Sequence, residues 1–141
     1  MQPVLENKFT YKGYPCVVLF MPGTYRCGYV GIPSNHKLAK KSVDELSFLD
    51  CHGGITYSEP YLHECEDNNT WWIGFDCAHC FDGYDIETAK QYFGNEPDFQ
   101  RTYAIMQDLW NEANKEYKFS TLSYVKEECK KLVDQIEKEG C

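Results

Sequence analysis

The spacing of apolar residues changes once along this chain, near residue 84, and that change limits the possible folds. Before it, short runs rich in β-branched and aromatic residues alternate with turns, most clearly at residues 14–21, 24–32 and 70–75. After it, apolar residues recur every three or four positions, which is typical of helices that pack on one face. Strands followed by helices predict an α+β fold, with a mostly antiparallel N-terminal sheet packed against C-terminal helices.

Turn signals divide the first half of the chain. Only Pro22-Gly23 separates the first two runs, and this spacing predicts a β-hairpin. Shorter segments at residues 9–11 and 55–57 also predict strands. Between them, Ser42 and Glu45 have the spacing of a capping box, which predicts a short helix over residues 42–49.

The second half predicts three amphipathic helices. Asp85 is a suitable N-cap for residues 86–93, residues 96–98 form a good helix start, and a last helix is expected over residues 121–139. The apolar stripes of the two longer helices are expected to face the core. They consist of Phe99, Tyr103, Met106 and Trp110 in one helix, and of Leu122, Val125, Cys129, Leu132 and Ile136 in the other.

The length of 141 residues predicts a single domain, with a strand-rich part at residues 1–84 that carries the functional site and a helical part at residues 85–141. No apolar stretch approaches the ~20 residues of a membrane helix. The first residues show no basic segment followed by an apolar one, so we expect a cytoplasmic protein with reduced thiols.

Charge is distributed unevenly. Residues 1–41 have a net charge of +5, residues 42–84 carry nine acids and no Lys or Arg, and the whole chain has a net charge of −8. Direct nucleic-acid binding is disfavoured because it requires a basic surface. The acidic segment either attracts a cation or forms a solvated face, and the sequence leaves both open.

Chemically versatile side chains cluster between residues 51 and 80, which contain three of the four histidines and four of the eight cysteines. One interpretation is a site for zinc or another divalent metal with His52, Asp76 and His79 as ligands, three ligands being the catalytic form of such a site. Cys77 and Cys80 also have a zinc-compatible spacing, but a second such pair is missing.

Two other interpretations remain for this cluster. Cys77 beside His79, or Cys27 facing His52, would form a thiolate–imidazole pair for nucleophilic chemistry. Alternatively, these side chains only satisfy hydrogen bonds of their own loops.

Three segments resemble a family of small, largely uncharacterised proteins of bacteriophages and other mobile elements. They are residues 25–33 with His36 nearby, residues 52–57 (HGGITY) and residues 71–79 (WWIGFDCAH). The family pattern also matches Asp82 but not Cys80. The resemblance implies a phage setting and a role for Arg26 as an anion contact. It also favours five further polar residues as members of the site: His36, His52, Asp76, His79 and Asp82.

Three functions are therefore expected. The first is a phage accessory protein, acting against host defence, that binds a small anionic or nucleotide-like ligand. Its pocket would be formed by Arg26, His36, His52, Tyr57, Trp71, Trp72, Asp76, His79 and Asp82. The second is an acidic inhibitor that binds a host protein by mimicking nucleic acid. The third is a metal-dependent hydrolase that uses His52, Asp76 and His79.

Overall fold

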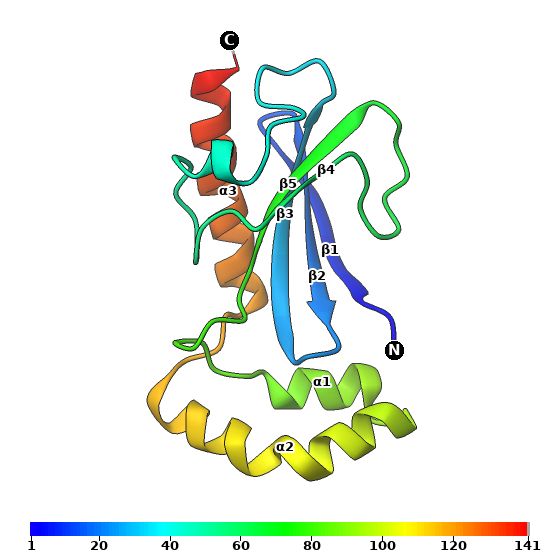
Figure 1. The fold of residues 1–141 in the computed structure, drawn as a ribbon. Coiled ribbons are helices and arrows are strands. Elements are labelled where there is room, and N and C mark those ends of the chain that lie inside the picture. The colour runs from blue at the N-terminus through cyan, green and yellow to red at the C-terminus, as the bar shows by residue number, and fades with distance from the viewer. Residues whose placement is uncertain (141) are drawn as a thin grey trace.

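The computed structural model describes residues 1–140 and contains one five-stranded sheet and three α-helices in that range (Figure 1). All neighbouring strands are antiparallel, in the order β1-β2-β3-β5-β4. The strands are β1 (Val4–Tyr11), β2 (Tyr14–Met21), β3 (Tyr25–Pro33), β4 (Tyr57–Glu59) and β5 (Thr70–Asp76). The helices are the 3-10 helix η1 (Asp44–Leu46) and the α-helices α1 (Ile86–Phe93), α2 (Pro97–Glu116) and α3 (Leu122–Glu139). The predicted α+β class is confirmed.

The predicted β2–β3 hairpin forms the centre of the sheet, with Phe20 opposite Arg26 next to the turn. β1 begins at Val4, earlier than the strand predicted at residues 9–11, because pairing with β2 extends the strand through the polar residues Glu6 and Asn7. Lys12 and Gly13 join β1 to β2 with positive φ angles of 52° and 86°, as a tight hairpin turn requires.

Two further predicted elements differ in extent from the observed ones. The Ser42–Glu45 capping box forms, but it leads only into the short helix η1 instead of a helix over residues 42–49. The strand expected at residues 55–57 begins at Tyr57 instead, because Ile55 turns into the core while residues 57–59 pair with β5.

Helix α3 lies along one face of the sheet (Figure 1), and most of its predicted apolar stripe is buried there against Val18, Val30 and Phe75. Gly28 on β3 permits this close approach, since a Cβ at that position would lie 2.8 Å from Sγ of Cys129. The opposite face of the sheet is covered by the β4–β5 loop, which inserts Leu62 and Cys65.

Helices α1 and α2 lie across one end of the sheet (Figure 1). Phe20 from the tip of β2 packs there with Ala89 and Phe93 of α1 and with Phe99 of α2. Asp85 caps α1 as predicted, accepting a hydrogen bond from the backbone N of Thr88. Within residues 1–140, no helix combines the length and apolar character needed to span a membrane.

Candidate metal centre

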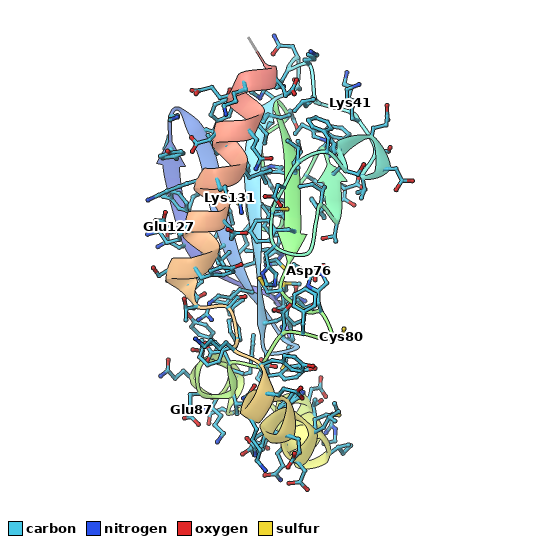
Figure 2. All side chains as sticks on the ribbon, turned by 90° about the vertical axis from the view of Figure 1, so that its left-hand side faces the viewer. Lys41, Asp76, Cys80, Glu87, Glu127 and Lys131 are labelled. Carbon is cyan, nitrogen blue, oxygen red and sulfur yellow. The ribbon has the colours of Figure 1, made fainter. Side chains whose placement is uncertain are left out.

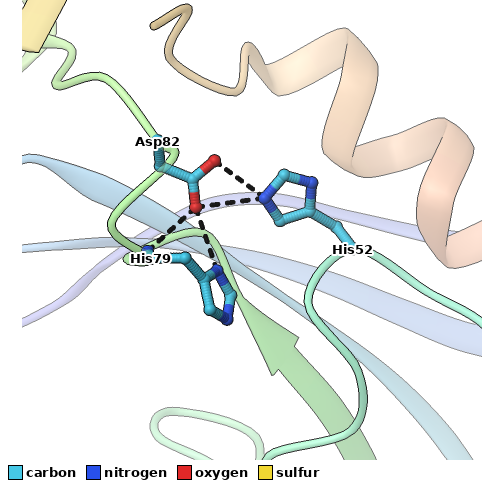
Figure 3. Close-up of side chains that lie close together, drawn as sticks. All are labelled: His52, His79 and Asp82. Carbon is cyan, nitrogen blue, oxygen red and sulfur yellow. Dashed lines mark hydrogen bonds and ion pairs between the residues drawn. The ribbon is translucent and has the colours of Figure 1, made fainter.

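Three side chains from two distant loops meet below the N-terminal end of α3: His52, His79 and Asp82 (Figure 3). His52 Nε2 lies 2.8 Å from Oδ1 and 3.1 Å from Oδ2 of Asp82, and His79 Nδ1 lies 3.0 Å from Oδ2. One donor atom from each residue lies within 4.8 Å of the other two. Among residues 1–140 this is the one group of three potential metal ligands that converges.

Asp82 is held by the turn that follows β5. Its backbone N donates to the carbonyl O of His79 at 2.9 Å, and its Oδ2 accepts a hydrogen bond from the backbone N of His79 at 3.0 Å. The carboxylate is buried but is fully satisfied by this N–H and by the two imidazoles. The local turn therefore fixes the carboxylate between both rings.

His52 is presented by a glycine turn. Cys51 anchors the turn in the core, and the backbone N of Gly54 donates to the carbonyl O of Cys51 at 3.0 Å. Gly53 and Gly54 have φ angles of 71° and 87°, which glycine adopts without steric cost. The conspicuous Gly pair of the sequence thus serves to turn the chain beside His79.

A fourth residue, Tyr124 in the first turn of α3, completes the arrangement. Its hydroxyl lies 2.8 Å from Nδ1 of His52, and its ring stands edge-on to the imidazole. Burial raises the pKa of this tyrosine, so the hydroxyl keeps its proton at neutral pH. Tyr124 is not predictable from the sequence, because its position beside the apolar stripe of α3 gives no sign of a polar contact 72 residues away.

Asp76 is not one of the converging ligands, which corrects the predicted set of His52, Asp76 and His79. It ends β5, where its Oδ1 accepts a hydrogen bond from the backbone N of Ala78 at 3.1 Å. Its Oδ1 lies 3.8 Å from Nε2 of His79. Asp82 takes its place because the turn after residue 78 points that carboxylate inward.

Arg26 is not placed to contact an external anion, contrary to expectation. Its buried guanidinium pairs with both carboxylate oxygens of Glu6 at 2.6 and 3.1 Å, with Oδ2 of Asp85 at 2.8 Å and with the carbonyl O of Ser120 at 3.0 Å. These partners come from β1, the α1 cap and the α2–α3 connector. Arg26 therefore ties three parts of the fold together.

The other expected pocket residues are also dispersed. Trp71 and Trp72 point to opposite faces of the sheet, as neighbours in a strand must, and Trp72 packs on the same face as Tyr57. His36 packs near Gly140 at the far end of α3, about 24 Å of helix from Tyr124. The structure therefore does not assemble the predicted anion pocket.

The cysteines do not form the expected reactive groups. Burial raises the pKa of Cys77 and of Cys27 to about 12, which keeps both as thiols at neutral pH. Cys77 points into the core, whereas Cys80 is exposed at the surface near Asp76 (Figure 2). The Cys77–Cys80 pair is therefore not arranged as a metal clamp.

The cluster opens on one side into a pocket of about 460 Å³, which His52, Asp82 and Tyr124 line. The chain matches no known protein-family profile, no curated protein and no solved structure. The chemistry of the site must therefore be inferred from its donors. Two imidazoles and one carboxylate are a set that binds zinc and other divalent transition metals.

Proposed function

We propose that His52, His79 and Asp82 bind a divalent metal ion, with zinc as the best match to these donors, and that the protein is a metal-dependent hydrolase. The main support for the proposal is that one potential donor atom from each of these three residues lies within 4.8 Å of the other two. Around a tetrahedral ion with coordination bonds of about 2.0–2.2 Å, ligand atoms lie roughly 3.4 Å apart, so the two imidazole nitrogens would move slightly away from the Asp82 oxygens, which lie 2.8–3.1 Å from them.

The number of ligands favours a catalytic role over a structural one. Structural zinc sites are closed by four protein ligands, whereas catalytic sites use three and leave a position for water or substrate. Because His52 and Asp82 line the pocket, that position would face an open space. A bound ion would supply a water molecule with a pKa lowered to about 7.

The surroundings of the cluster also suit a cation. All three ligands lie in the segment 42–84, which carries nine acids and no Lys or Arg. If His52 held an ion through Nε2, its proton would reside on Nδ1 and would be donated to the Tyr124 hydroxyl 2.8 Å away. Such a contact with the second ring nitrogen is usual for histidine ligands.

Metal analysis tests the proposal. The protein, carrying Cys80→Ser to remove the exposed thiol, is purified without added metal, loaded with Zn²⁺ or Co²⁺, desalted and analysed by elemental mass spectrometry. We expect one ion per chain and a visible Co²⁺ absorption band with nitrogen and oxygen ligands. Asp82→Asn and His79→Gln should lose the ion while keeping the circular dichroism spectrum of the parent.

The two histidines outside the cluster provide matched controls. His36 lies at the far end of α3 and His63 in the β4–β5 loop, so His36→Gln and His63→Gln should retain the ion. A parent protein without stoichiometric metal, or an ion that survives Asp82→Asn, would refute the proposal.

The phage setting, the cytoplasmic location and the host-protein partner stay predictions of the sequence. If the ligand is a small anion, the metal ion would be the cation that binds it, since Arg26 is already paired. The acidic-inhibitor alternative depends on Glu64, Glu66 and Asp67, which are exposed in the β4–β5 loop. Neutralising these three side chains together would then weaken binding to the partner.

A further inference from the structure

Beside the metal centre, the connector between α2 and α3 is flanked by two hollows. The first, of about 460 Å³, includes His52 and Asp82, and the second, of about 540 Å³, continues along the C-terminal end of α2. Both are lined by Glu116, Tyr117, Lys118, Phe119 and Thr121. We call these two hollows together the aromatic groove.

Three large rings are exposed where the groove meets the metal centre. Phe81 is 48% exposed, Phe119 40% and Tyr124 41%. The ring of Phe81 stacks on His79 with an interplanar angle of 4° and a centroid distance of 5.0 Å, while Tyr124 stands edge-on to His52. Exposed apolar side chains gathered at one place mark a binding surface more often than scattered ones do.

The wall of the groove is held in place by contacts with the rest of the fold. The carbonyl O of Ser120 accepts a hydrogen bond from Arg26, and that of Lys118 accepts one from the backbone N of Gly83. Thr121 Oγ1 caps α3 by accepting a hydrogen bond from the backbone N of Tyr124 at 3.1 Å. The exposed rings are therefore displayed on a preformed wall, which is usual for small-molecule sites.

From this arrangement we propose that the aromatic groove binds the flat ring of a small ligand whose oxygen atoms coordinate the ion at His52, His79 and Asp82. This inference rests on the proposed metal centre. The groove offers rings for stacking but few charges, since Lys118 is offset by Glu116 and Lys115 pairs with Glu112. An aromatic carboxylate, ester or amide fits this balance, whereas a nucleotide polyphosphate would need several unpaired cations.

Hydroxamates with and without a ring test the inference. Co²⁺-loaded protein is titrated with acetohydroxamate and with benzohydroxamate, and the cobalt absorption band reports binding of each. We expect benzohydroxamate to bind about tenfold more tightly, because only its ring contacts the groove. Phe119→Ala should remove most of this difference, and Phe119→Leu, which keeps an apolar side chain but no flat ring, should remove part of it.

Phe48→Ala is the matched control, since Phe48 is 54% exposed but lines a different hollow. It should leave the preference for benzohydroxamate unchanged. If cobalt binds and the two hydroxamates bind with equal affinity, the inference of a ring-binding groove is wrong, and the proposed metal centre is supported. If cobalt itself does not bind, both proposals are overturned.

Discussion

Gly53 lies against the imidazole of His79 so closely that a Cβ at Gly53 would be 2.1 Å from Cε1 of the ring. The positive φ of 71° at Gly53 adds backbone strain for any other residue. We therefore predict that Gly53→Ala pushes His79 out of the cluster and weakens Co²⁺ binding by at least about tenfold. Titration followed by the cobalt absorption band measures this change.

Gly54→Ala is the control for Gly53→Ala, because it introduces backbone strain without displacing the imidazole of His79. Gly54 has a similar φ of 87°, but a Cβ there meets nothing within 4 Å. This variant should lose about 1 kcal/mol of unfolding free energy and keep its affinity for Co²⁺. Equal Co²⁺ affinities for Gly53→Ala and the parent protein would mean that His79 is not a ligand.

Tyr124→Phe removes one hydroxyl and leaves the ring in place. Since that hydroxyl lies 2.8 Å from Nδ1 of His52, its loss leaves the second ring nitrogen without its acceptor when Nε2 binds an ion. Loss of such partners typically lowers metal affinity by about 10–100-fold, and we expect a change in this range. Tyr117→Phe, which alters another tyrosine of the same groove, should change the affinity little. Competition with a calibrated chelator measures both affinities.

Much of the fold could be predicted because it follows from local patterns. The β2–β3 hairpin is encoded by two β-rich runs around Pro22-Gly23, and α3 by an apolar stripe that ends up against the sheet. The extents of β1 and β4 could not be predicted in the same way. Pairing with neighbouring strands decides where Val4 and Tyr57 join the sheet.

The candidate site could be predicted only in part. The clustering of polar residues brings His52, His79 and Asp82 among the candidates, but Asp76 and Asp82 are each three residues from His79. The choice between them depends on the turn geometry after β5, which residue types do not specify. Likewise, the family resemblance predicts Arg26 as an anion contact, and the sequence does not reveal its actual partners Glu6 and Asp85, which are 20 and 59 residues away.

The pairing of Arg26 predicts a large effect on stability. Arg26→Met leaves the buried carboxylates of Glu6 and Asp85 without their common cation. Removing one partner of a buried ion pair typically costs about 3–5 kcal/mol, and urea unfolding should show a loss of that size. Lys130→Met, in the more exposed pair with Glu127, should change the unfolding free energy by less than about 1 kcal/mol. A similar cost for both variants would contradict the bridging role of Arg26.

The buried thiols predict a loss of stability in alkali. Burial raises the pKa of Cys27 from 9.0 to about 12. Above pH 9 the unfolded state releases this proton while the native state keeps it, so the unfolded state binds fewer protons and the unfolding free energy falls as pH rises. For one such thiol the fall is about 1.4 kcal/mol per pH unit between pH 9 and pH 12.

Cys27→Ala isolates that contribution. At pH 8 the variant should be less stable than the parent protein, because Cys27 is 5% exposed and its removal leaves a cavity. At pH 10.5 the unfolding free energy of the variant relative to the parent should be about 2 kcal/mol more favourable than at pH 8, since the variant has no thiol to ionise on unfolding. The difference between the two proteins should therefore shrink or change sign. Urea unfolding at both pH values measures the two differences. If the cost of Cys27→Ala were the same at pH 8 and pH 10.5, the native thiol would titrate like an exposed one, and burial would not govern its ionisation.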